Sequence, residues 1–405
     1  MKTPIYNVVA MVLAAFVADA ALSQTPRYTA TPLAPLPGHF RLYTNAINNR
    51  GAVVGLSYGS PSSNTPFVYT KTDGVKALPL PPGYGYSVPQ DINDDGVIVG
   101  YAQPTWSAEQ SMVAWKYKDG QFTVHASQVS FANAINSAGT IVGRSCLSGT
   151  QLTCYFKNEP GGSLETVGPA NFYSSSWWRL IDINDAGQIL YTPNNGVGAG
   201  AVRQPDGSVT LLTPPPSPYV RTYTWQINGT GQAAARWEYN VGSQYFSKAF
   251  VWDVASGARP VGVTDTYMIP KGLNRLGQVV GQSGKNQDSM YTTWIWTPQG
   301  GTEELRPLVD PTGNLLLTGV YGINGRGQIL AEGILQNPAP SATIQYILSA
   351  ACTADYNADG FVNGDDFDAF ALDFDAGIGA ADIDQNGFTN GDDFDVFAPA
   401  FEAGC

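Results

Sequence analysis

The sequence predicts an all-β protein, a seven-bladed β-propeller with four-stranded blades, followed by a small α-helical module. Three observations lead to this prediction: a repeat of about 45 residues, a composition rich in turn formers, and acidic residues concentrated at the C-terminal end. The 45 Gly, the 28 Pro and a charged fraction of only 13% suit short strands joined by turns. A net charge of −12 argues against a nucleic-acid-binding protein, which needs a basic surface.

Residues 1–23 have the pattern of a signal peptide. Lys2 precedes an apolar run from Val8 to Val17, and small residues then offer a cleavage site before Ala21 or Gln24. The run is shorter than the roughly 20 residues that a membrane-spanning helix needs. We therefore expect a secreted or cell-surface protein without a transmembrane segment in the mature chain. A buried N-terminal strand is the alternative.

Within residues 24–350 one pattern recurs, an Asn preceded by Ile or Leu, a Gly three residues later and then apolar residues. The copies begin at Asn48, Asn93, Asn136, Asn184, Asn228, Asn274 and Asn324. Asn at the first position of a type I turn hydrogen-bonds its own backbone, and Gly at the fourth accepts a positive φ. Each copy therefore predicts a hairpin between two buried strands.

Each repeat then continues into a second hairpin, so one unit supplies four strands, as a propeller blade does. An open β-solenoid or a sandwich array is the alternative. The last unit reaches Cys352 with only three strands. Residues 28–37 resemble the fourth-strand stretch of the first unit, and we expect them to complete the last blade and close the ring.

The repeats resemble the HAF repeats of secreted bacterial proteins. The resemblance lies in the core seen in DINDDGVIVG and in the later strand Ala249–Trp252, and it covers roughly residues 40–350. It implies an extracellular β-propeller-like protein and carries over no catalytic residues.

Residues 352–405 hold 13 acidic residues and no Lys or Arg. Two twelve-residue segments in this region, 355–366 and 382–393, place oxygen-bearing side chains at the spacing of an EF-hand-like calcium loop, with Gly at the sixth position. The expected ligands are Asp355, Asn357, Asp359, Phe361 through its carbonyl, Asn363 and Asp366, and then Asp382, Asp384, Asn386, Phe388 through its carbonyl, Asn390 and Asp393. We therefore expect two Ca²⁺ ions. A solvated acidic tail, the alternative, does not account for the aligned Gly360 and Gly387.

The module, residues 351–405, resembles a type I dockerin, because both loops end in Asp and each is followed by Phe residues at helical spacing. Its repeated NGDDFD and its final Glu402–Cys405 resemble the GC-type dockerins of planctomycete-like bacteria. The resemblance implies a cohesin-like or other scaffold or surface protein as partner. The positions that set partner choice in cellulosomal dockerins carry Gly-Asp here, and a calcium-stabilised cap without a partner is the alternative.

Four cysteines agree with an oxidising compartment. Cys146 lies close to Cys154, and Cys352 and Cys405 bracket the acidic module. We expect the local pairs 146–154 and 352–405, although the sequence alone allows three pairings.

Aromatic side chains in the inter-strand loops could stack on sugar rings, and Tyr84, Tyr86, Trp177 and Trp178 are the candidates for exposed positions. Packing between blades is the alternative role. The chain has no G-x-S-x-G or H-E-x-x-H motif. Asp91 and Asp182 share one repeat position and could form a carboxylate pair for glycosidic cleavage, or be hydrogen-bonded structural acids.

The sequence thus favours a secreted, non-enzymatic binding propeller with a polysaccharide as the candidate ligand, tethered by the dockerin-like module. One alternative is a dockerin-bearing polysaccharide-degrading enzyme, a glycoside hydrolase or a polysaccharide lyase. The other is a structural matrix or adhesion protein.

Overall fold

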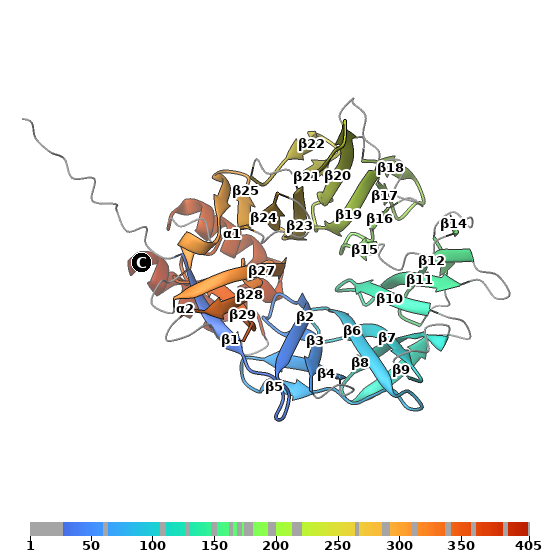
Figure 1. Cartoon of the computed structure of the whole chain (residues 1–405). Helices are drawn as coiled ribbons and strands as arrows, with labels where there is room; N and C mark the ends of the chain where they lie inside the picture. Colours follow the sequence, from blue (N-terminus) through green and yellow to red (C-terminus); the bar gives the residue numbers. More distant parts are fainter. Residues whose placement is uncertain are drawn as a thin grey trace, which may run out of the picture.

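In the computed structural model, antiparallel sheets stand around a common centre, and two helices lie beside them (Figure 1). The structure describes residues 27–59, 64–105, 111–125, 130–146, 152–161, 165–167, 172–173, 181–192, 200–212, 221–263, 267–285, 292–309, 314–336, 342–357, 362–383 and 388–403. The expected signal peptide lies outside these residues. The architecture confirms the all-β prediction for the larger part of the described chain.

Three four-stranded sheets follow the order of the chain. They consist of β2 (Arg41–Ile47), β3 (Val53–Tyr58), β4 (Asn64–Thr70) and β5 (Gly74–Ala77); β6 (Tyr86–Ile92), β7 (Ile98–Gln103), β8 (Val113–Lys118) and β9 (Gln121–His125); and β15 (Ile181–Ile183), β16 (Ile189–Tyr191), β17 (Ala201–Arg203) and β18 (Val209–Leu211). Another sheet contains β10 (Ser130–Ile135), β11 (Ile141–Cys146), β12 (Leu152–Asn158), β13 (Glu165–Thr166) and β14 (Phe172–Tyr173), the last two both pairing with β12.

An eight-stranded sheet consists of two further units of four strands. Its strands are β19 (Arg221–Ile227), β20 (Ala233–Val241), β21 (Gln244–Asp253), β22 (Gly257–Pro260), β23 (Tyr267–Leu273), β24 (Val279–Gly284), β25 (Thr292–Thr297) and β26 (Gly301–Glu304). A parallel bridge between Ser247 and Tyr267 joins the two units. This bridge is the backbone link that merges the two units into one sheet, and each unit keeps its own antiparallel order.

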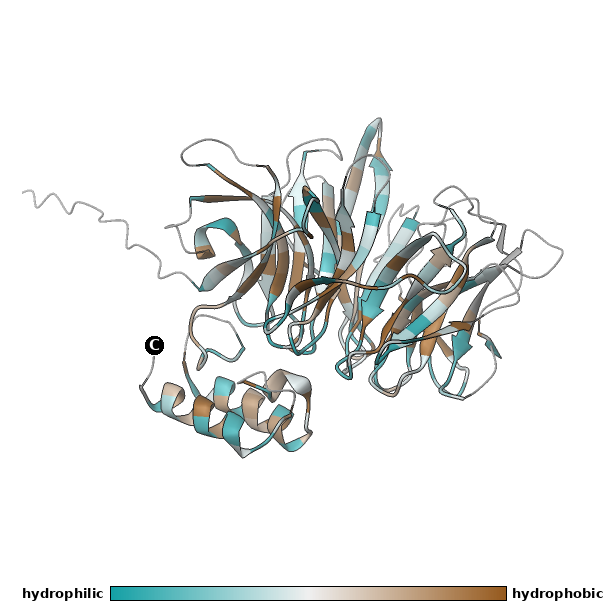
Figure 2. Cartoon of the chain, turned by 90° about the horizontal axis from the view of Figure 1, so that it is seen from below, coloured by the Kyte–Doolittle hydropathy of each residue, from teal (hydrophilic) through white to brown (hydrophobic). Residues whose placement is uncertain are grey.

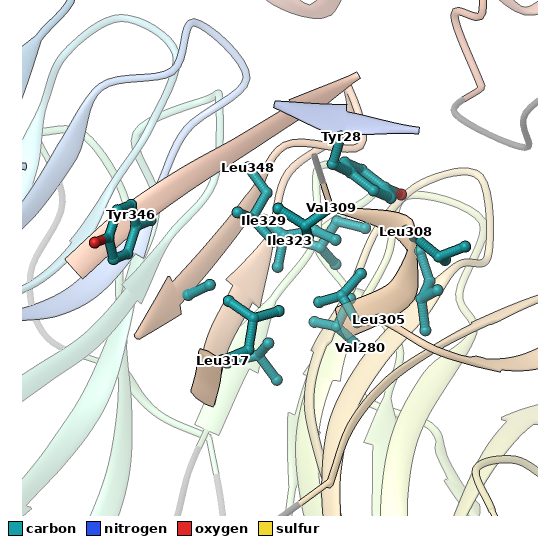
Figure 3. Packing of buried hydrophobic residues seen from close by; sticks show 13 residues of the cluster. Tyr28, Val280, Leu305, Leu308, Val309, Leu317, Ile323, Ile329, Tyr346 and Leu348 are labelled. Carbon is teal, nitrogen blue, oxygen red and sulfur yellow. The ribbon is translucent and has the colours of Figure 1, made fainter. Parts of the chain in front are cut away.

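The last sheet joins the two ends of the β-rich region. Its strand order is β1 (Tyr28–Leu33), β29 (Ile344–Ala350), β28 (Ile329–Leu335) and β27 (Leu315–Ile323). Antiparallel pairing runs from Tyr28 opposite Ala350 to Leu33 opposite Gln345. Tyr28 is fully buried and packs with residues of β27–β29, of β24 and of the short 3-10 helix η3 (Arg306–Leu308) (Figure 3). The N-terminal segment thus completes the last unit, as the sequence predicted.

Within each repeat turn, the Gly N–H donates to the Asn carbonyl at 3.0–3.1 Å, and the Gly has a φ between 72° and 82°. This backbone is strained for any residue with a Cβ. The Asn side chain accepts from its own turn, as in Asn48, whose Oδ1 accepts from Arg50 N at 3.1 Å and Ala52 N at 2.8 Å. The predicted turn chemistry is confirmed.

The same asparagines form a closed ring of hydrogen bonds among the described residues. Each Nδ2 donates to the carbonyl of the next repeat Asn at 2.8–3.2 Å, through all seven positions. The bond from Asn324 to Asn48 closes the circle across 276 positions of the chain. All seven side chains are buried. One residue type thus fixes both the hairpin and its distance from the neighbouring unit.

A second glycine position lets adjacent strands approach closely. A Cβ on Gly55 would lie 2.0 Å from the Tyr43 carbonyl oxygen, and one on Gly281 would lie 2.2 Å from Trp294. Gly100 and Gly143 are equally crowded. Glycine at this position is therefore a packing requirement.

The C-terminal module consists of α1 (Gly364–Asp375), the 3-10 helix η5 (Gly379–Ala381) and α2 (Gly391–Ala403). The two helices lie on the side of the ring where the strands end in the repeat turns (Figure 2). Within the described part of the chain, no helix is long and apolar enough to cross a membrane.

Candidate metal centre

The first loop ends in a helix that its own residues cap. The Asn363 Oδ1 accepts from Asp365 N at 2.7 Å, and the Asp366 Oδ2 accepts from Asn363 N at 3.0 Å. This reciprocal arrangement is a capping box, and it satisfies N–H groups that the first helical turn leaves without partners. The Asp366 Oδ1 also accepts from Asn357 N at 3.0 Å. Asp366, at position 12 of the loop, therefore fixes the backbone of Asn357 at position 3 and of Asn363 at position 9.

The second loop repeats this geometry. The Asn390 Oδ1 accepts from Asp392 N at 2.7 Å, and the Asp393 Oδ2 accepts from Asn390 N at 2.9 Å. The ends of the two loops, residues 363–366 and 390–393, thus have the same local structure 27 positions apart, which agrees with their duplicated sequence.

The carboxylates at both ends of each loop are buried. Asp366, Asp382 and Asp393 are 0% exposed and Asp355 is 6% exposed. Taking carboxylates out of water is costly unless cations or hydrogen-bond donors surround them. Hard oxygen ligands at this spacing fit Ca²⁺, and the buried acids therefore fit the ion that the sequence predicts.

The remaining expected ligands divide into two groups. Asn357, Asn363, Asn390 and Phe388 are described, and the exposed Phe388 ring is compatible with ligation through its carbonyl. Asp359, Phe361, Asp384 and Asn386 lie outside the described residues. Within the described part, no group of three or more His, Cys, Asp or Glu is placed to hold a metal ion.

A small aromatic core joins the two helices. Phe370 and Phe397 are fully buried and stack with ring centroids 4.1 Å apart, and Tyr356 packs edge-on against both. The helical spacing of the Phe residues also directs Phe367 and Phe394 toward this core, and their ring centroids lie 5.7 Å from Phe401 and 6.3 Å from Phe370, although the two side chains stay 40% and 42% exposed. They lie one turn nearer the helix starts, at the rim of the helix pair.

Arginines from two repeat turns hold the second loop. Arg50 Nη1 donates to Asp382 Oδ2 at 3.0 Å, and Arg326 Nη1 donates to the Asp382 carbonyl at 2.8 Å. Burial lowers the pKa of the Arg326 guanidinium, although acidic residues around it act in the opposite direction. Asp382 therefore contacts both the first and the last repeat.

A third turn arginine holds the first loop and α1. Arg275 forms an ion pair with Asp373, which is 0% exposed, and Asp373 also accepts from the Tyr356 hydroxyl at 2.6 Å. Burial raises the pKa of Tyr356 to about 12, against the lowering effect of Arg275 and Arg326. A carboxylate buried inside the module thus has its cationic partner on the propeller.

The sequence did not single out these three arginines. The sequence does hold a clue to them: three repeat turns contain an arginine, and the C-terminal module has 13 acidic residues and no basic one. Nothing in the repeats alone says which face of the ring the module would contact, since the turns and the opposite loops both lie at the ends of strands.

Asp91 and Asp182 bridge neighbouring units. Asp91 accepts from Ile92 N and from Ile135 N of the next unit, and Asp182 accepts in the same way from Ile183 N and Ile227 N, all at 2.8–2.9 Å. Burial raises the pKa of Asp91 to about 6 and that of Asp182 to about 7, and backbone donors act against this rise. This bonding favours the structural alternative for both acids.

The aromatic candidates are only partly described. Tyr84 packs against the apolar cluster around Trp115, and Tyr86 is half-buried. Trp177 and Trp178 lie outside the described residues. Tyr84 therefore takes part in packing, and sugar stacking stays a prediction for all four residues.

The structure shows one cysteine in a disulfide, and the pairs 146–154 and 352–405 stay predictions. Cys352 is disulfide-bonded, and Cys405, its expected partner, lies outside the described residues. On the adjacent strands β11 and β12, Ser145 lies opposite Cys154 and Cys146 lies opposite Thr153.

No protein-family model matches the chain, and no curated protein matches it. Among solved structures, the chain is similar to an oligogalacturonate lyase in complex with manganese, with a TM-score of 0.50 and 11% identity over 79% of this chain and 93% of the lyase. It is also similar to the β-propeller domain of the Trilobed protease from Pyrococcus furiosus, with a TM-score of 0.48 and 9% identity over 76% of this chain and 96% of that domain. At such identity the likeness to the lyase shows the fold alone. The chain has a β-propeller fold.

Proposed function

We propose that this protein is a secreted or cell-surface, seven-bladed propeller that binds a ligand without chemical turnover, and that a calcium-loaded, dockerin-like module tethers it to a scaffold or surface protein. The blade count is supported by the closed circle of seven Asn hydrogen bonds, one per repeat. The observation that carries the proposal for the module is the duplicated loop, capping box and helix, with buried carboxylates at the first and twelfth positions of both loops.

The module would hold two Ca²⁺ ions through the residues at positions 1, 3, 5, 7, 9 and 12 of each loop. When bound, the ions would neutralise part of the negative charge of a segment that has no basic residue. The capping-box acids Asp366 and Asp393 would then fix each loop against its helix.

Calorimetric titration of the mature chain, residues 24–405, with Ca²⁺ tests this proposal. We expect two equivalents for the wild type and one each for Asp359→Asn and Asp384→Asn. Asp375→Asn is the matched control, because Asp375 is an exposed acid outside both loops, at the end of α1. Absence of saturable binding, or an equal loss in the control, would rule out the loops as the metal sites.

For the propeller we propose a polysaccharide ligand. The support comes from half-buried aromatic rings at the strand ends away from the repeat turns. Tyr43 and Tyr58 meet with centroids 4.6 Å apart, and Tyr101 stacks on Phe131 at 4.3 Å. Aromatic faces with neighbouring hydroxyl groups suit sugar rings, which are apolar on one face and polar at the edge.

Retention of the mature chain on a panel of soluble and insoluble polysaccharides tests the ligand class. We expect saturable retention that falls in Tyr58→Ala and Tyr101→Ala but not in Tyr69→Ala, because Tyr69 lies at the turn end of its sheet, opposite Val53. Reducing ends released in the same assay would favour the degrading-enzyme alternative. Retention by cells in Ca²⁺ without any polysaccharide binding would favour the matrix alternative.

A further inference from the structure

The contact between Asp382 and two turn arginines lies where the ring closes. Arg50 belongs to the first repeat and Arg326 to the last, and both bind Asp382 or its carbonyl, at 3.0 and 2.8 Å. Arg326 Nη2 also approaches the Ile383 carbonyl at 3.5 Å. One residue of the module therefore bridges the two ends of the repeat array.

Other closure contacts surround this bridge. The Gly325 N–H donates to Asn49 Oδ1 at 2.6 Å, and Asn324 Nδ2 donates to the Asn48 carbonyl at 2.8 Å. These bonds join residues 276 positions apart, so none of them is supported by a short chain connection. A module that holds Arg50 and Arg326 at a fixed distance would therefore stabilise the closure directly.

Asp382 is also the first position of the second calcium loop. A carboxylate offers about four lone-pair sites, so it can accept from a guanidinium and ligate a metal at the same time. Metal binding commonly orders a loop that does not keep its structure alone. In this module, 13 acids without any base oppose the compact loop until a cation is bound.

We propose that Ca²⁺ in the second loop fixes Asp382 as a bridge between the first and last repeats, so that metal loading of the module stabilises the closed propeller. This inference rests on the calcium loading proposed above and adds a consequence to it. The module is then a metal-dependent clasp on the ring as well as a tether.

Fluorescence can follow the propeller separately from the module. All nine Trp residues lie between positions 106 and 296, and residues 352–405 contain none. The experiment is thermal unfolding of the mature full chain, followed by Trp fluorescence, in millimolar Ca²⁺ and in a chelator. We expect Ca²⁺ to raise the midpoint of the Trp transition by about 3 °C or more. An unchanged midpoint, in a protein that calorimetry shows to bind two Ca²⁺, would overturn the clasp and leave the tether proposal intact.

The double variant Arg50→Met, Arg326→Met removes the bridge without touching a loop residue. We expect it to bind two Ca²⁺ and to lose the Ca²⁺-dependent shift of the Trp transition. Arg259→Met is the matched control and should keep the shift, because Arg259 pairs with Asp253 on a neighbouring strand of its own unit. A full shift in the double variant would overturn the proposal.

If the double arginine variant does not fold, single variants in the two calcium loops test the same proposal. Asp384→Asn, in the second loop, should abolish most of the shift, whereas Asp359→Asn, in the first loop, should keep most of it. Equal effects would refute the assignment to Asp382. A chain that binds no Ca²⁺ at all would refute both the clasp and the metal site.

Discussion

Replacing Asn228 by Ala should destabilise the propeller by about 3–4 kcal/mol. Besides a bond from the Thr230 hydroxyl, the side chain makes four hydrogen bonds: Oδ1 accepts from Thr230 N at 3.1 Å and Gln232 N at 2.9 Å, and Nδ2 donates to the Asn274 carbonyl at 3.0 Å and to Gln232 Oε1 at 2.9 Å. Each such bond contributes about 1 kcal/mol net. The Asn228 side chain is buried, so water cannot fully replace the lost partners.

Equilibrium unfolding in urea, followed by Trp fluorescence, measures this loss, and the midpoint should fall without a change of slope. Thr230→Ala is the matched control. Thr230 is exposed and its hydroxyl adds one bond to the same Asn228 oxygen, at 2.8 Å, so the control should stay within about 0.5 kcal/mol of the wild type. If Asn228→Ala proves as stable as this control, the Asn circle contributes nothing to stability and the reasoning fails.

Two further predictions concern packing and pH. Gly281→Ala should destabilise by roughly 1–3 kcal/mol, since its Cβ would meet Trp294 at 2.2 Å, whereas Gly229→Ala, with nothing within 4 Å, should be nearly neutral in the same urea assay. Burial raises the pKa of Asp182 from 3.8 to about 7, so the folded state binds this proton more tightly than the unfolded chain does. The stability from this group is complete below about pH 4 and is lost as the pH rises to about 7. Asp182→Asn should remove that part of the pH dependence of unfolding, and an unchanged pH profile would contradict the assigned environment.

The repeat turns could be predicted because their chemistry is local. Asn48 and Gly51 define a hairpin within four residues, and the structure has this hairpin at each repeat. The donor side of the same Asn could not be predicted, because its acceptor is a carbonyl about 45 positions away. Several side-chain orientations satisfy the turn, and only the spacing of neighbouring units selects the one that reaches Asn93.

The module shows the same limit. Spacing after the loops predicted the two helices, and their starts are local too, since Asp366 and Asn363 interact over three positions. The pairing of Arg275 with Asp373 could not be predicted, because a turn arginine facing solvent satisfies the local sequence equally well. The acidic charge of the module is compatible with a basic surface, but only the fold brings three arginines to one face.

The pairing of β1 with β29 also imposes an order on biogenesis. Thr29 and Ser349 meet across 320 positions, and contacts of such high sequence separation form slowly because a long loop must close first. A growing chain therefore makes β1 among its first strands and completes its partner only after Ile344–Ala350 has been synthesised. Until then both ends of the array expose open strand edges, which invite aggregation. Prematurely terminated products should accordingly be lost to aggregation or proteolysis, so that only a finished chain accumulates.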